Sequence, residues 1–214
     1  MEGWYLGQEG GTAAARVLFG DVNPGGKIPV TFPRSVGQLP DYYNHKPSRN
    51  RSYAFVDNSP LYPFGYGLSY TNSKFENLRL DPASIGANGS TVMHVDVTNT
   101  GSRAGTEVVE MYIHQKHATI VQPVMALRGF KRVALKPGEK VTVDLPLTHE
   151  SLSMIGMDMK PVVEPGAFDV MVGPSSAETQ TVTLTVEKPT LRATAASHAA
   201  RSTPAKTSAE AAKP

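Results

Sequence analysis

Few residues of this 214-residue chain have the types and spacing that a catalytic site requires. Glu9, in the glycine-rich run 7–11, is the carboxylate most easily taken for a catalytic acid. It stands directly before a predicted helix over 12–19, where negative charge is favoured by the helix dipole, so we expect a structural role. The same run lacks the Lys-Ser/Thr pair of a phosphate-binding loop. Ser69 lies outside any Gly-x-Ser-x-Gly motif, which argues against a hydrolase nucleophile.

His114 and His117 form a His-x-x-His pair at the end of a predicted strand. Positions i and i+3 of a strand point to opposite faces, and no cysteine or acidic partner stands at the spacing that zinc sites use. We expect two solvated loop histidines and no metal site. The chain has no cysteine at all, which excludes disulfides and thiolate chemistry. We therefore predict that it contains no catalytic, cofactor-binding or metal-ligating residue.

An aromatic and glycine-rich run spans residues 61–70. Glycine allows backbone turns that other residues resist, and a proline within the run fixes one φ angle. Aromatic side chains dominate buried contacts, so we predict a packed structural junction rather than a catalytic centre. Its members are Tyr62, Phe64, Gly65, Tyr66 and Gly67. Sugar stacking at the rim of a binding site is the alternative use of these rings.

Three regions follow from the patterning of the chain. Residues 1–72 contain one predicted helix, capped by Thr12 and ended by Gly20, and a short predicted strand over 27–32. One helix and one strand are too few to bury a core alone. We therefore expect this region to be the C-terminal remnant of a larger domain. Residues 189–214 are rich in Ala, Thr, Ser, Lys and Pro. Such a tail buries too little apolar surface to offset the entropy of ordering, and we expect disorder.

Residues 73–188 show the period-2 alternation of half-buried β-strands. Met93, Val95 and Val97 share one face, and 109, 111 and 113 form a second apolar row opposed by 108, 110 and 112. Turn signals such as Pro137-Gly138 separate the runs. About seven short strands with regular turns indicate an antiparallel β-sandwich. The predicted fold class is therefore mainly β, with a partial α/β remnant before the sandwich and a disordered tail after it.

Composition excludes several classes of partner. The net charge is +2, which gives no signal for nucleic-acid binding. No apolar run of about 18 residues is present, so no membrane span is expected. The first residues lack a basic segment followed by an apolar stretch, so we predict no signal peptide.

Several motifs, in a fixed order, resemble glycoside hydrolase family 3 enzymes of the bacterial β-glucosidase and β-xylosidase type. They lie at 7–13, 18–33, 39–47 and 60–71, and residues 95–173 are similar to the fibronectin type III-like domain that ends many of these enzymes. The resemblance covers roughly residues 4–188. It implies the end of the α/β sandwich domain over 1–72 and a fibronectin type III-like domain over 73–188.

The resemblance also implies a function for the parent enzyme. The parent enzyme would hydrolyse β-glucosides or β-xylosides with retention, without a cofactor, and would be periplasmic or secreted. A retaining glycosidase needs two carboxyl groups about 5 Å apart. In the family the nucleophile stands on a separate barrel and the acid/base earlier in the sandwich, and this chain carries neither motif. We expect it to be inactive alone, with the remaining catalytic domains as partners and β-linked oligosaccharide bound only by the whole enzyme. A carbohydrate-binding or adhesion module, or a subunit of a split glycosidase, are the alternatives.

Overall fold

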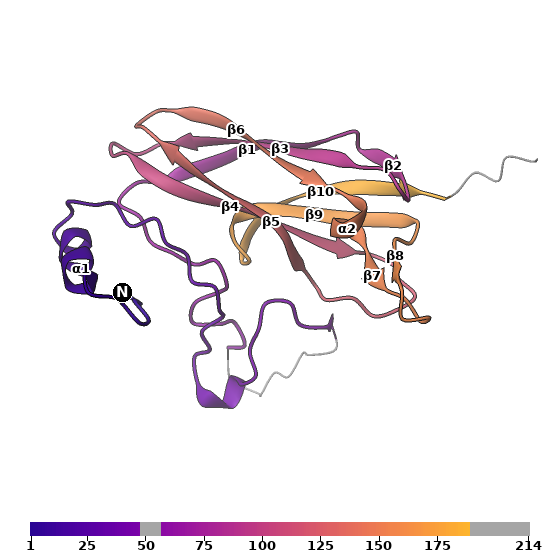
Figure 1. Ribbon diagram of the computed structural model, residues 1–214, viewed down its shortest axis with the longest axis horizontal. Helices are drawn as coiled ribbons and strands as arrows, with labels where there is room; N and C mark the ends of the chain where they lie inside the picture. The colour runs from indigo at the N-terminus through magenta and orange to yellow at the C-terminus, as the bar shows by residue number, and fades with distance from the viewer. Residues whose placement is uncertain (48–56, 189–214) are drawn as a thin grey trace, which may run out of the picture.

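The computed structural model describes residues 1–47 and 57–188. Two sheets pack face to face in it (Figure 1). The first has the order β1 (Ser73–Asp81), β3 (Thr91–Asn99), β6 (Lys140–Leu147). The second has the order β2 (Ser84–Gly86), β10 (Glu178–Glu187), β9 (Gly166–Ser175), β4 (Gly105–Gln115), β5 (Ala126–Leu135). All these pairs are antiparallel except the short β2 beside β10. The expected mainly-β sandwich is confirmed.

The core lies between the two sheets and comes from the apolar rows that alternation predicts. Met93, Val95 and Val97 of β3 are at most 1% exposed. They face Val109 and Met111 of β4, which are fully buried in the same cluster. Burial of apolar surface at about 25 cal/mol per Å² is the main stabilising contribution to such a sandwich.

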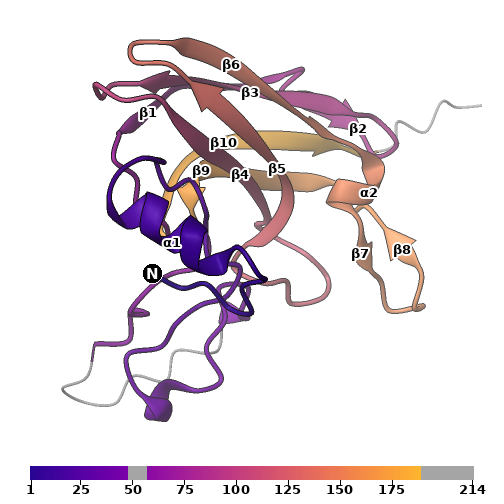
Figure 2. The ribbon, with the colours of Figure 1, turned by 60° about the vertical axis from the view of Figure 1, so that its left-hand side comes forward.

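A small appendage extends one end of the sandwich. The short helix α2 (His149–Leu152) follows β6 and leads into a two-stranded hairpin, β7 (Met154–Ile155) and β8 (Pro161–Val162). Figure 2 shows this hairpin projecting beside the end of the five-stranded sheet. Leu152 of the helix is 2% exposed and joins the main core.

Residues 1–47 and 57–72 form the N-terminal segment. It lies against the outer face of the five-stranded sheet, away from the three-stranded one (Figures 1 and 2). Its regular elements are α1 (Gly10–Leu18) and the 3-10 turn η1 (Val36–Gln38). The helix begins two residues before the predicted start, so the prediction of Thr12 as its cap is wrong: Glu9 occupies the N-cap position. Gly20 follows the helix with a φ of 81°, as expected of a residue that ends a helix.

The prediction of a strand over 27–32 is wrong, because none of the strands includes these residues. They are held by a single bridge from Phe32 to Tyr62, and by backbone hydrogen bonds from Ile28 N–H to the Tyr66 carbonyl and from Gly65 N–H to the Ile28 carbonyl. The ladder stays irregular because Pro29 and Pro63 lack amide donors. Among the described residues, no helix is long and apolar enough to cross a bilayer. The tail over 189–214 lies outside the described residues.

Candidate functional site

The junction between the N-terminal segment and the sandwich centres on the outer face of β4. Alternation places Val108, Glu110 and Tyr112 on that face, which an uncovered sandwich would expose to water. All three are buried, and Tyr112 is fully so. The cover comes from residues 43 and 64–65, which lie far earlier in the chain.

Three rings form the apolar part of this junction. Tyr43 stacks on Phe64 with ring centroids 4.3 Å apart, and both rings meet Tyr112 edge-on, at 5.7 and 6.5 Å. Stacked and edge-on pairs at these distances each add about 0.5–1.5 kcal/mol beyond area burial. The Phe64 backbone is fixed as well, since its carbonyl accepts hydrogen bonds from the Ser176 amide (2.9 Å) and hydroxyl (3.0 Å).

A carboxylic acid is enclosed beneath these rings. Glu110 is 5% exposed and accepts a hydrogen bond of 2.5 Å from the Tyr112 hydroxyl. Burial raises the pKa of Glu110, and burial together with this hydrogen bond raises the pKa of Tyr112 well above its ordinary value. Lys27 lies near Glu110 and pairs with Glu107 at 3.1 Å, so this cation is shared between two acids.

Two glycines let the junction backbone approach this closely. Gly65 has a φ of 81°, and a β-carbon there would overlap the Glu110 carboxylate. The φ of Gly67, in contrast, is not positive. Gly67 is instead required by space, because a β-carbon would overlap the Gly26 carbonyl oxygen.

A cavity of about 420 Å³ opens beside the buried acid. The N-terminal segment contributes 25–29 and Phe64 to its wall, and β4 and β5 contribute Glu110, Phe130 and Arg132. Phe130 is 62% exposed, so this wall is open to solvent on one side. Among the described residues that line this cavity, Glu110 is the only acid, so the lining does not supply the two opposed carboxyl groups of a glycosidase.

A second set of contacts holds the helix end of the segment to the sandwich. The Tyr70 hydroxyl donates to the Val17 carbonyl at 2.7 Å, and the guanidinium of Arg103 donates to the Gly20 carbonyl at 2.8 Å. Arg103 also lies over the Tyr70 ring, 5.6 Å from its centre. Asn23 accepts from the Tyr70 amide at 2.7 Å. These contacts are polar and largely exposed, so each is worth less than the buried ring cluster.

The N-terminal segment also exposes an unusually large apolar surface. Trp4, Phe32, Tyr62 and Tyr66 follow one another with centroid distances of 6.4, 6.2 and 5.0 Å. Trp4 is 58% exposed and Tyr62 42%. The same segment exposes further large side chains: Tyr5, Leu6, Leu18, Phe19, Val36 and Leu39. Monomeric proteins seldom leave so much apolar surface in one region, and such surfaces mark contacts with other parts of a protein or with partners.

The other sequence candidates do not assemble into a chemical site. Glu9 is exposed, and its side chain does not cap the helix. Ser69 is hydrogen-bonded to Asn23. His117 is exposed, but His114 lies within β4, is half-buried and bonds through Nδ1 to the Pro123 carbonyl, so the expectation of a solvated loop residue is wrong for His114. No group of three metal-ligating side chains occurs among residues 1–47 and 57–188.

Sequence reasoning missed Glu110 and Tyr43 as members of the junction. One signal was present: Glu110 is a lone acid inside the apolar run 108–113. Charged residues are almost never fully buried unless they are paired, so a charge in such a run points to a partner on the neighbouring layer. Nothing in the sequence shows that this layer is the N-terminal segment.

Comparison with known proteins follows this division of the chain. Residues 1–70 match the family model of the glycosyl hydrolase family 3 C-terminal domain, and residues 107–176 match that of the fibronectin type III-like domain. The chain belongs to glycoside hydrolase family 3. It is 48% identical over 193 residues to a beta-xylosidase of Formosa agariphila, covering 87% of this chain and 27% of the relative. It is 45% identical over 188 residues to a periplasmic beta-glucosidase of Salmonella typhimurium, covering 83% and 25%.

Solved structures of family members show the same fold. A β-glucosidase from Erythrobacter marinus superposes with a TM-score of 0.81 at 46% identity, over 83% of this chain and 24% of that structure. A beta-glucosidase from Listeria innocua in complex with glucose gives 0.82 at 34% identity, over 86% and 27%. This family 3 chain thus spans about a quarter of the length of these relatives and matches their C-terminal portion.

Proposed function

We propose that this family 3 chain is the structural C-terminal part of a glycosidase that hydrolyses β-glucosides or β-xylosides. Its relatives are named for these activities, and it matches only their C-terminal quarter. The reaction belongs to the remaining domains. The part played by this chain is to hold them: one side of its N-terminal segment is fastened to the sandwich, and the other side docks against the rest of the enzyme.

One observation carries the proposal: different parts of the N-terminal segment differ in burial. Phe64 and Gly65 enclose a buried acid against the sandwich. Elsewhere in the segment, Tyr5 is fully exposed, Phe19 is 85% exposed and Leu18 is 69% exposed. Each large apolar side chain that is transferred from water to an interface contributes about 1.5–3 kcal/mol, so a few such side chains suffice to hold a neighbouring domain.

The proposed division of the chain places the boundary at 72/73, with the family 3 sandwich remnant over 1–72 and the fibronectin type III-like domain over 73–188. Support comes from β1, which begins at Ser73, and from the junction residues Tyr62, Phe64, Gly65, Tyr66 and Gly67, which lie directly before it. We assign these five residues to the structural junction, where they fix the N-terminal segment on the sandwich and so hold its docking surface in place.

Complementation tests the docking role. The Formosa agariphila beta-xylosidase, truncated before the portion that matches this chain, is co-expressed with the 214-residue chain, and hydrolysis of aryl β-xylosides and β-glucosides is measured. We expect activity only when both parts are present. Phe19→Asp should abolish complementation, because it places a charge in the proposed interface. Val121→Asp is the matched control: Val121 is 60% exposed on the sandwich and outside the proposed interface.

The possible outcomes of this experiment contradict different parts of the proposal. Complementation that survives Phe19→Asp and is lost with Val121→Asp would place the interface on the sandwich and contradict the proposed docking side. Activity of the 214-residue chain alone would contradict the structural role itself. Both variants change exposed residues, so their folding is checked by comparing urea-unfolding midpoints with that of the unmodified chain.

A further inference from the structure

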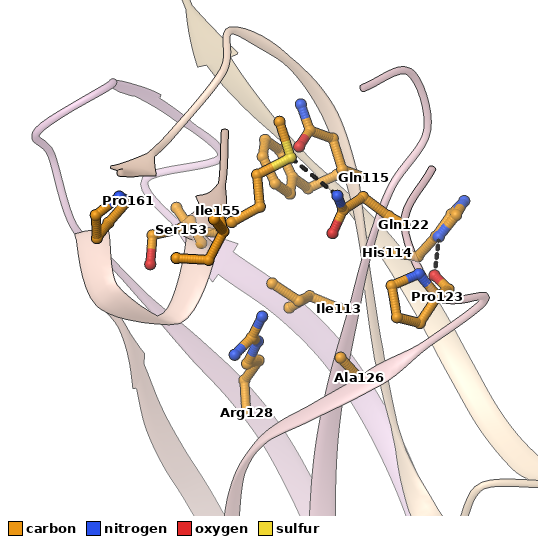
Figure 3. A pocket seen from close by; sticks show the side chains of 13 residues that line it. Ile113, His114, Gln115, Gln122, Pro123, Ala126, Arg128, Ser153, Ile155 and Pro161 are labelled. Atoms are coloured by element: carbon orange, nitrogen blue, oxygen red, sulfur yellow. Dashed lines mark hydrogen bonds between the residues drawn. The ribbon is translucent and has the colours of Figure 1, made fainter. Parts of the chain in front are cut away.

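A second cavity, of about 450 Å³, lies at the end of the sandwich that carries α2 and the β7–β8 hairpin (Figure 3). It shares no lining residue with the cavity beside Glu110. Its volume falls within the range of about 300–1,000 Å³ that is usual for small-molecule sites. The docking role proposed above makes no use of it.

The floor of this cavity is apolar and rigid. Ile113, Leu152 and Phe168 are 6%, 2% and 1% exposed and belong to the main core. Since they come from β4, α2 and β9, the floor is held by three elements packed together. Such a surface can receive the C–H face or the π face of a ring.

The Arg128 side chain brings a positive charge into the cavity, and this charge has no acidic partner there. Figure 3 shows the Arg128 side chain reaching from β5 towards the space between Ile113 and Ser153. Within the part of the chain that the structure describes, its guanidinium has no ion pair or hydrogen bond, and no aspartate or glutamate lines the cavity. A planar guanidinium with unused donors matches a carboxylate bidentately. The charge of this cavity therefore selects an anion.

The rim offers two separate polar groups. The Gln122 amide nitrogen donates to the Ile120 carbonyl at 3.1 Å and lies 3.0 Å from the Met154 sulfur, which leaves its carbonyl oxygen. Ser153 donates its hydroxyl to the Glu150 carbonyl and keeps acceptor capacity. Polar groups at two points of a rim suit a ring with several hydroxyls, whereas a plain aromatic acid would leave them unused.

We propose that this cavity binds a hexuronic acid. The sugar carboxylate pairs with Arg128, the C–H face of the ring lies on Ile113 and Phe168, and the ring hydroxyls bond to Gln122 and Ser153. This is a binding site without chemistry of its own.

The test is a titration of the isotope-labelled 214-residue chain with sodium glucuronate, followed by NMR. We expect saturable shifts of the amides of Ile113, Gln115 and Phe168. Glucose, which lacks the carboxylate, should bind at least about tenfold more weakly, because a charge-assisted hydrogen bond is worth roughly a factor of ten or more in affinity. Benzoate, which has the carboxylate and lacks the hydroxyls, should also bind more weakly than glucuronate.

Two matched variants locate the site. Arg128→Gln should weaken glucuronate binding about tenfold or more and leave glucose unchanged. Arg132→Gln removes the same charge from the same strand but outside this cavity, and should leave glucuronate binding unchanged. Four results would overturn the proposal: no saturable shift with glucuronate, equal binding of glucose, benzoate binding as tightly as glucuronate, or equal losses in the two variants.

Discussion

Replacing Gly65 by alanine tests whether the junction is closed over Glu110. Alanine at a φ of 81° lowers the free energy of unfolding by about 1–2 kcal/mol, because its side chain disfavours the left-handed backbone. Its β-carbon also overlaps the Glu110 carboxylate, which must move and give up its hydrogen bond from Tyr112. A hydrogen bond to a charged group is worth about 1.5–3 kcal/mol. We therefore expect Gly65→Ala to cost about 2.5–5 kcal/mol of unfolding free energy, measured by urea titration.

Gly138→Ala isolates the backbone part of this cost. Gly138 has a similar φ of 73°, but a β-carbon there meets no atom within 4 Å. Its substitution should cost only the left-handed penalty of about 1–2 kcal/mol. If the N-terminal segment detaches before the sandwich unfolds, the excess for Gly65→Ala appears instead as faster proteolysis within residues 1–72.

A double variant tests whether the cost of Gly65→Ala comes from the overlap with Glu110. Glu110→Ala removes the group that the new β-carbon would overlap, so Gly65→Ala should cost much less in that background than in the unmodified chain. Equal costs of Gly65→Ala and Gly138→Ala, together with additive effects of Gly65→Ala and Glu110→Ala, would refute the view that the junction backbone encloses this carboxyl group.

Three further outcomes are expected. Phe64→Ala should cost about 2–3 kcal/mol in urea unfolding, below the 3–5 of a fully buried ring, because Phe64 is only half-buried beneath its stack with Tyr43; an unchanged midpoint would contradict its role. Burial raises the pKa of Glu110, so its contribution to stability is complete below the ordinary carboxyl pKa and is lost as pH rises through the raised value. Unfolding free energies measured from about pH 4 to 8 should fall with rising pH in the unmodified chain, and this fall should be absent in Glu110→Gln. It should remain in Glu107→Gln, at the neighbouring acid that pairs with Lys27. Finally, the purified chain should not hydrolyse aryl β-glucosides, and turnover that disappears in Glu9→Gln would show that the carboxylate at position 9 is catalytic.

Much of the sandwich could be predicted because its signal is local. The alternation in 93–97 places one row of side chains in the core whatever the neighbouring strand is, since the period of a strand is two. Pro137-Gly138 indicates a turn for the same reason: the φ of each residue depends on its own covalent structure. The short motifs of residues 7–71 likewise identify the family by their order, without any knowledge of their contacts.

The junction could be predicted only in part. The composition of 61–70 indicates packing, but the sequence does not show that Gly65 rather than Gly67 carries the positive φ, because that choice depends on which atoms each glycine meets. The helix start at Gly10 instead of Thr12 is a similar case, where the tertiary position of the preceding residues overrides the capping preference.

The sequence by itself determined the β-sandwich, its inner face and the family of the chain. Only the tertiary structure decided that the outer face of β4 is buried, that Glu110 lies under Phe64 and Gly65, and that Arg128 enters a second cavity without a counter-ion. The physical reason is range: alternation and turn chemistry act between residues a few positions apart, whereas burial of a charged side chain depends on surfaces that folding brings together from distant parts of the chain.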